Sequence, residues 1–500
     1  MFRRVIKNSG SNVLVLVVRV AITLVMTPVI LHALGDYDFG IWEIVSAVVG
    51  YMGLLDLGMK PAITRYAALY NGHGSREKLS ELFATSCLFM LAVGFLLFVS
   101  FILWGLFGAD VLAESGEPED RYIYFLLIIA CQLLITFPGC VAQSFIFGFQ
   151  KYALNNMIIV CTLLVGAALI YQYIDKENAL VLVAFISTAG MFIRYTLLFF
   201  IVAMHKDMAI RFKMTSANLR MFNELIRFGF KSFVQGAGSV VENQSAALLV
   251  GWLMGPAYVV FYAMPASIAR YLQTVGWAVS DTFMPLFSDL YARQENDKVL
   301  QVYLDYSRYL LGGVLPLGLS VFLFGPDFIA LWVGPEYIED GQLLLAILVL
   351  SFLLPLLDPF GSHLLIANNR HGILAVISPL AAVLNIVSSI IFINFYGVLG
   401  AALGALLPAC VATPIILKYV CKELDISVMF YLKRCLFPLL FPVLIFVVMV
   451  SLLLSAYSID SYFDLLSLGA VAVAVYALLF FYLVLNSYER NKIVVYIISR

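Results

Sequence analysis

The chain has 500 residues, of which 63% are hydrophobic and 12% are charged, and its formal net charge is −1. Soluble domains carry about a quarter charged residues, so this composition excludes an ordinary soluble fold. Apolar runs of about 18 residues or more recur along the whole chain, and each is long enough to cross a hydrocarbon core of about 30 Å as a helix. The sequence therefore predicts an all-α, polytopic membrane protein.

We predict fourteen transmembrane spans from these apolar runs. The first follows a basic N-terminus, and it is too long and lacks the small-residue cleavage site of a signal peptide. The predicted spans are centred approximately on residues 12–34, 39–58, 80–107, 122–148, 153–174, 178–204, 230–254, 257–280, 307–333, 342–366, 373–395, 397–417, 435–456 and 464–486.

Basic residues are sorted between the two sides of these spans. With the N-terminus placed in the cytoplasm, the inside segments hold 25 of the 30 Lys and Arg residues. The outside loops hold only Arg121 and Lys176, and three arginines remain within spans. Cytoplasmic loops retain positive residues, so the pattern predicts that both termini are cytoplasmic.

The stretch GYMGLLDLGMKPAITRYAALY (50–70) shows how one span ends. Its apolar part is the cytoplasmic end of the second span, and Lys60 and Arg65 are predicted to anchor that end on the inside. Pro61 is favourable in the first turn of a helix. It therefore predicts the start of a short interfacial helix, AITRYAALY.

An internal repeat divides the chain. LFGADVLA (106–113) recurs as LFGPDFIA (323–330), and FPG (137–139) matches the position of DPFG (358–361) at nearly the same offset. Two parallel six-helix halves typify transporters, with the substrate path between them. The predicted domains are a six-helix bundle at 1–204, a basic cytoplasmic linker at 205–229, a second six-helix bundle at 230–420, and two further helices with a cytoplasmic tail at 421–500.

Five ionisable residues are predicted to lie within the spans: Arg19, Arg194, Arg270, Glu242 and Asp358. At 1.5 Å per residue they fall roughly 18–24 Å from the outer ends of their helices. Charges at such depth tend to face an interior cavity, and the arginine fork suits phosphate oxygens. The pattern predicts an anion site held by the three arginines, with Glu242 balancing their charge.

A structural interpretation of the same residues remains open. Glu242 then pairs with Arg270 across adjacent helices, and Arg194 extends its head towards the membrane surface. Asp358 is interpreted either as a proton or cation site or as a cap at a helix break, and the cap is preferred.

Enzymatic motifs are absent from the sequence. It contains no phosphate-binding loop, no HExxH and no GxSxG, and its cysteines and histidines lack metal-ligand spacing. We therefore predict a non-enzyme with no metal, cofactor or nucleic-acid partner, and coupling to H⁺ or Na⁺ is left open.

The LGxxxFGIW turn, the LLDLGMKPAITRY span exit (both within 27–79) and YGVLGAALGALLP (396–408) resemble bacterial polysaccharide-biosynthesis membrane proteins. These are the O-antigen and exopolysaccharide flippases of the multidrug/oligosaccharidyl-lipid/polysaccharide exporter superfamily. The resemblance implies a V-shaped pair of six-helix bundles in the bacterial inner membrane that works by alternating access. Fourteen spans depart from the twelve of the multidrug branch.

The resemblance also implies the cargo and its partners. The cargo is a polyprenyl-pyrophosphate-linked oligosaccharide, and the partners are membrane lipids and polysaccharide polymerase or synthase machinery. Related lipid II flippases use arginines in a central cavity, and Arg19 and Arg270 lie at suitable positions. The alternatives are a multidrug exporter of the same superfamily and a non-transporting scaffold of a synthase complex.

Overall fold

The computed structural model describes residues 2–113, 119–175, 177–204, 216–338, 341–370 and 372–491. In these ranges the chain forms helices and turns with no β-strand, which confirms the all-α prediction. It divides into two compact units, Met1–Gln244 and Ser245–Arg500. The predicted four-part division stays a prediction. Residues 205–215 of its linker lie outside the described residues, and α7 already begins at Leu219.

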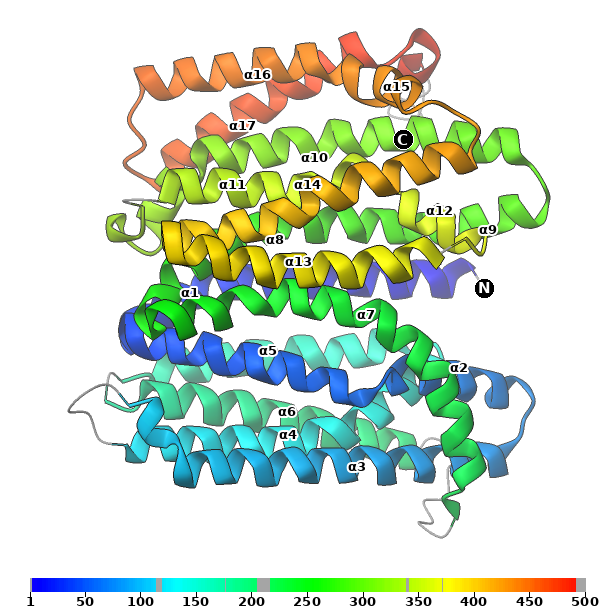
Figure 1. Ribbon diagram of the computed structural model, residues 1–500, viewed down its shortest axis with the longest axis vertical. Coiled ribbons are helices and arrows are strands. Elements are labelled where there is room, and N and C mark those ends of the chain that lie inside the picture. The colour runs from blue at the N-terminus through cyan, green and yellow to red at the C-terminus, as the bar shows by residue number, and fades with distance from the viewer. Residues whose placement is uncertain are drawn as a thin grey trace. The chain divides into compact units, whose positions relative to one another are not determined.

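Unit 1 is built from long helices (Figure 1) and two short 3₁₀ turns, η1 and η2. The symbol η is also used for two short π-helical segments of unit 2, η8 and η9. Helices α3, α4 and α6 pack side by side, and α5 packs against α1 and α6. The elements are α1 (Phe2–Met52), η1 (Gly53–Asp56), α2 (Met59–Gly72), α3 (Arg76–Phe107), η2 (Ala109–Val111), α4 (Asp120–Gly148), α5 (Tyr152–Tyr173), α6 (Ala179–Met204) and α7 (Leu219–Met254), which continues into unit 2.

Unit 2 repeats this pattern and then adds the C-terminal helices α16 and α17, which pack on each other and on α10. Its elements are η4 (Pro256–Tyr258), α8 (Val259–Ser280), η5 (Asp281–Phe283), α9 (Met284–Ala292), α10 (Asn296–Trp332), η6 (Pro335–Tyr337), α11 (Gly341–Leu353), η7 (Pro355–Leu357), α12 (Gly361–Ala367), α13 (Gly372–Tyr396), α14 (Val398–Glu423), α15 (Val428–Tyr431), η8 (Leu432–Leu436), α16 (Phe437–Ala456), α17 (Tyr462–Leu479) and η9 (Phe480–Val484).

Eleven helices within the described ranges are long and apolar enough to cross a membrane. Helix α1 covers the first two predicted spans, because only one residue, Gly35, has non-helical backbone angles between them. Its φ of 73° favours glycine, and the helix bends there. Helices α7 and α8 coincide with the seventh and eighth predicted spans but are not among the eleven. Both carry polar side chains along their length, so their apolar content is lower. The predicted number of fourteen stays a prediction.

The internal repeat extends to small features of each unit. In both units a short 3₁₀ turn leads into an amphipathic helix: η1 precedes α2, and η5 precedes α9. In both units a glycine with positive φ separates the first two helical segments, Gly35 at 73° and Gly255 at 108°. These shared positions match the sequence repeat.

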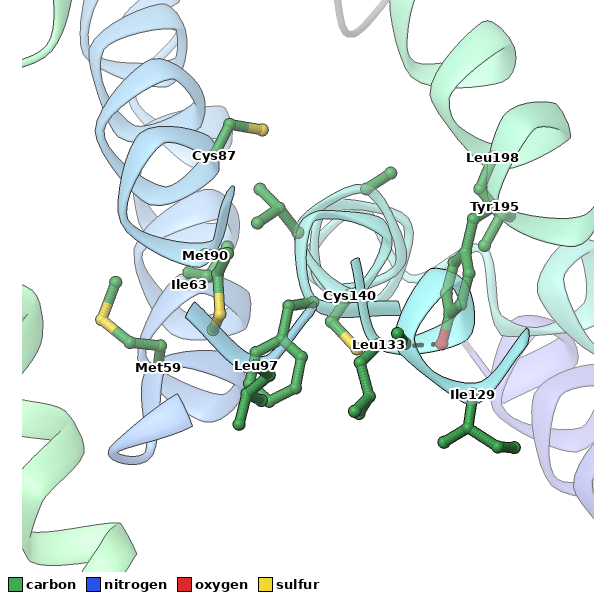
Figure 2. Packing of buried hydrophobic residues seen from close by; sticks show 14 of the residues in the cluster. Met59, Ile63, Cys87, Met90, Leu97, Ile129, Leu133, Cys140, Tyr195 and Leu198 are labelled. Carbon is green, nitrogen blue, oxygen red and sulfur yellow. Dashed lines mark hydrogen bonds between the residues drawn. The ribbon is translucent and has the colours of Figure 1, made fainter. Parts of the chain in front are cut away.

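The core of unit 1 lies between α2, α3, α4 and α6 (Figure 2). Met59 and Ile63 of α2 are fully buried, so the helix predicted after Pro61 has one face inside the bundle. A Cβ on Gly148 of α4 would lie 2.7 Å from the Cβ of Ala67 on α2, so α2 and α4 pack at close range there. The basic segment after the second span is therefore a packing element of the bundle.

Helix α7 docks onto that same segment. A Cβ on Gly58, whose φ is 75°, would overlap the carbonyl oxygen of Gly229 on α7. The guanidinium of Arg65 lies 4.3 Å from the ring centroid of Phe228, a cation–π geometry. The turn at Gly58 thus joins α7 to the rest of unit 1.

Candidate functional site

Arg19 lies on α1 with its side chain exposed. About two turns before Arg19, hydrogen bonds hold this helix to α5: the Nδ2 of Asn156 donates to Asn12 Oδ1 at 2.6 Å and to Ser11 Oγ at 3.0 Å. Among the described residues of unit 1, no carboxylate lies in ion-pair range of Arg19. Its guanidinium therefore keeps its hydrogen-bond donors available.

Glu242 lies on α7 in unit 1 and is exposed. The neighbouring turn is fixed against α1, because Tyr51 Oη donates to the carbonyl oxygen of Val241 at 3.4 Å. A Cβ on Gly50 would lie 2.7 Å from Gln244 Nε2, so α1 and α7 approach closely here. In the described part of unit 1, Glu242 has no basic partner within ion-pair distance.

Arg194 lies half-buried on α6. Its guanidinium carbon is 5.2 Å from the ring centroid of Tyr195, and the Oη of that tyrosine is 3.8 Å from Cys140 Sγ on α4. The Nε of Arg194 is buried and has no hydrogen-bond partner among the described residues. The Nε atoms of Arg121 and Arg308 also lack a hydrogen-bond partner among the described residues, so what sets Arg194 apart is that no described carboxylate of unit 1 is in ion-pair range.

Arg270 lies half-buried on α8, five residues after Pro265, which is inside the same helix. Its carbonyl oxygen accepts a hydrogen bond from Thr274 Oγ1 at 3.0 Å. Its Nε is also buried without a hydrogen-bond partner, and no described carboxylate of unit 2 is in ion-pair range. Arg270 is therefore a second half-buried arginine without a counter-ion among the described residues of its own unit.

Asp358 lies at the break between η7 and α12 and is 8% exposed. Its Oδ1 accepts a hydrogen bond from Tyr303 Oη on α10 at 2.8 Å, and a Cβ on Gly361 would overlap its carboxylate. The carboxylate thus faces the first turn of α12, but the N-cap residue of that helix is Phe360, without a side-chain cap hydrogen bond. The Oδ2 of Asp358 is buried and has no hydrogen-bond partner among the described residues. Both interpretations of Asp358, cap and ion site, stay predictions.

Two other arginines, near the ends of predicted spans, provide a comparison because each has a carboxylate partner. Arg121 on α4 lies 3.4 Å from Asp38, whose other oxygen accepts a hydrogen bond from Tyr122 at 2.9 Å. Arg308 on α10 pairs with Glu489 beyond α17. Both have carboxylate partners that Arg194 and Arg270 lack within their units.

The structure does not join the five predicted site residues by contacts inside either unit. Arg19, Arg194 and Glu242 belong to unit 1, and Arg270 and Asp358 belong to unit 2. No hydrogen bond or ion pair connects members of the same unit among the described residues. Their predicted meeting in one layer stays a prediction.

A pocket in unit 2 was not predicted from the sequence. It has a volume of about 850 Å³ and is lined by helix ends and turns between Met254 and Leu399. Its aromatic residues are separated by up to 138 positions in the chain, the distance between Tyr258 and Tyr396. No local sequence motif therefore predicts the pocket. The only sequence signal is that tyrosine and phenylalanine recur at the outer ends of several predicted spans.

Solved structures identify the class of protein. The fold is similar to an inward-facing multidrug resistance MATE family transporter of the MOP superfamily, with a TM-score of 0.68 over 82% of this chain and 98% of that chain, at 13% identity. This likeness and the eleven apolar helices of the described ranges define a multi-pass membrane protein whose fold is similar to that of MATE family proteins.

Sequence comparison identifies the family. The family described as "Polysaccharide biosynthesis protein" matches residues 5–291, and the chain belongs to it. It is 24% identical to a Shigella flexneri protein named "Putative O-antigen transporter", over 80% of this chain and 94% of that protein. It is 22% identical to the "Uncharacterized membrane protein EpsK" of Bacillus subtilis (strain 168), over 97% and 96% of the two chains. The recognition made from the sequence is confirmed.

Proposed function

We propose that this protein translocates a polyprenyl-pyrophosphate-linked oligosaccharide across the bacterial cytoplasmic membrane for envelope polysaccharide synthesis. The family and the name of the Shigella flexneri relative support a saccharide cargo. The observation that carries the proposal is the pair of half-buried arginines, Arg194 and Arg270, which have no carboxylate partner among the described residues of their units, whereas Arg121 and Arg308 are ion-paired. The proposal has no catalytic step.

The arginines bind the pyrophosphate in this mechanism. A guanidinium donates two parallel hydrogen bonds to phosphate oxygens, and such bonds are about twice as strong as neutral ones. Arg270 and Arg19 contact the pyrophosphate, Arg194 adds a third charge, and Glu242 limits the positive charge of the unliganded site. Cargo drives the change from inward- to outward-facing states only because it binds the two states with different free energies.

Orientation and coupling complete the proposal. Both termini lie in the cytoplasm, as the charge pattern predicts, and the cargo is released towards polymerase or synthase machinery on the outer side. No cofactor takes part. Asp358 serves as a helix cap in this proposal. The alternative is that H⁺ or Na⁺ coupling takes place through Asp358, and the substitution Asp358→Asn distinguishes the two roles.

A multidrug exporter is the second candidate, because the similar solved structure is a multidrug resistance transporter. Organic cations are attracted to carboxylates and aromatic faces. Half-buried arginines on α6 and α8 repel such cations, so the arginine content of the helices favours the anionic cargo.

Substitution of Arg270 separates these functions. In a strain that depends on the protein for surface polysaccharide, Arg270→Ala is expected to abolish export at unchanged membrane abundance, and Arg270→Lys to retain only part of it. The matched control is Arg293→Ala, because Arg293 is exposed on the turn after α9 and pairs with Asp289 at 3.0 Å. Normal export by Arg270→Ala would refute the anion site, and drug sensitivity with normal polysaccharide would favour the multidrug exporter.

A further inference from the structure

The pocket of unit 2 lies where several helices begin or end. Its walls come from the end of α7, the start of α8, the turn before α11 with the start of α11, and the turn between α13 and α14, together with Phe322 from within α10. All of these except Phe322 are at predicted outer ends of spans. Glycines with positive φ make three of the turns, namely Gly255 at 108°, Gly334 at 135° and Gly397 at 59°. The backbone at these three turns beside the pocket therefore has a conformation that residues other than glycine rarely adopt.

Aromatic side chains make up a third of the pocket lining. Five of its fifteen lining residues are Tyr or Phe. The rings of Phe261 and Tyr337 lie 5.4 Å apart and form part of the wall, since Tyr337 is only 8% exposed. Tyr258 and Tyr396 are 48% and 58% exposed. The second pair is therefore accessible to a ligand.

Polar groups supply hydrogen bonds beside these rings. Glu336 and Gln342 line the pocket with exposed side chains, and together they offer carboxylate and amide acceptors and an amide donor. The carboxylate of Glu336 folds back over Gly334, where a Cβ would contact both of its oxygens. No lysine or arginine is among the lining residues.

We propose that this pocket is a saccharide subsite, which binds the glycan part of the cargo at the outer end of unit 2. The inference rests on the proposed function. A sugar ring has C–H faces that pack against the electron-rich faces of aromatic rings, and its hydroxyls pair with the carboxylate and the amide. A volume of about 850 Å³ is within the range of about 300–1,000 Å³ typical of ligand sites.

Other ligand classes fit the pocket less well. Phosphate needs positive donors, and none of the lining residues carries a positive charge. An organic cation binds well beside a desolvated carboxylate, because Coulomb attraction weakens in water. Glu336 is exposed, so its attraction for such a cation is weak. The pyrophosphate and the glycan of one cargo are thus assigned to different residues: the arginines bind the first, and this pocket binds the second.

Binding to the purified full-length protein in nanodiscs tests the subsite. The probes are the free saccharide released from the lipid carrier, inorganic pyrophosphate and tetraphenylphosphonium. We expect Tyr396→Ala and Tyr258→Ala each to weaken saccharide binding about tenfold, the loss of one stacking contact. Tyr457→Ala is the matched control, since Tyr457 is 61% exposed in the same unit and does not line the pocket. Pyrophosphate binding should be unchanged in all three.

Two results would overturn the subsite while the proposed function stands. One is saccharide affinity in Tyr396→Ala equal to that of Tyr457→Ala, with export still blocked by Arg270→Ala. The other is tetraphenylphosphonium binding that is lost in Glu336→Gln and is tighter than saccharide binding. If cells lacking the protein export polysaccharide normally, the proposed function fails and the subsite fails with it.

Discussion

Substitution of Glu489 provides a quantitative test of how the C-terminal helices attach to unit 2. Glu489 accepts hydrogen bonds from Arg308 and Tyr309 of α10 and from the backbone nitrogen of Asn486 at 2.8 Å. The side chains of Arg308 and Glu489 are only 7% and 13% exposed. The ion pair therefore fastens the segment after α17 to α10 in a largely water-free setting.

The expected cost follows from this burial. Removing one partner of a buried ion pair costs about 3–5 kcal/mol. In Glu489→Gln part of that cost is offset, because Asp305 lies 3.9 Å from Arg308 and the new amide still accepts a hydrogen bond. We expect a loss of about 2–3 kcal/mol in the free energy of detaching the C-terminal helices.

Thiol labelling reports that detachment. Cys435 in η8 is fully buried, and its Sγ donates to the carbonyl oxygen of Leu304 on α10 at 3.3 Å. When labelling is limited by opening, a loss of 2–3 kcal/mol raises its maleimide-labelling rate about 30- to 150-fold. Cys87, buried in unit 1, is the internal control read by mass spectrometry in the same sample. Unchanged Cys435 labelling, or an equal rise at Cys87, would refute the reasoning.

Three further predictions concern pH, backbone strain and Asp358. Burial raises the pKa of Glu489, but hydrogen bonds from Tyr309 and the Asn486 backbone, with the charge of Arg308, lower it by more. The stability advantage of wild type over Glu489→Gln should therefore be full above the ordinary Glu pKa of about 4.3 and should shrink as pH falls through the lower pKa of the folded state. A difference in melting temperature that does not depend on pH would contradict this. Gly58→Ala should lower the melting temperature, since φ is 75° and the new Cβ overlaps Gly229, whereas Gly53→Ala meets open space; equal effects would exclude the close approach of α7. Asp358→Asn should retain export and stability, because asparagine also caps helices, and lost export at normal stability would instead indicate ion coupling.

Much of the fold was predictable because long apolar runs determine transmembrane helices by length and composition alone. The break between the first two predicted spans falls at residues 35–38, and the structure has its bend there, at Gly35 with a φ of 73°. The buried face of α2 was not predicted, because a segment with Lys60 and Arg65 resembles an interfacial helix until Gly58 and Ala67 are seen to permit close packing. Local sequence does not reveal which helix a small residue faces.

The candidate site was predicted only as a set of residues. Charge within an apolar run marks Arg194 and Arg270 directly, because charge is costly there. The partner of Arg308 was not recognisable, since Glu489 lies 181 positions away in a polar tail. The pocket escaped prediction for the same reason: its residues come from helix ends far apart in the chain and, with Phe322, from within α10. Aromatic residues near span ends are also common in membrane proteins.

The measurement that tests the central claim most directly follows the lipid-linked saccharide in each leaflet of the cytoplasmic membrane after depletion of the protein. The account predicts accumulation in the cytoplasmic leaflet, reversed by wild-type protein and not by Arg270→Ala at equal abundance. An unchanged distribution between the leaflets after depletion would contradict it.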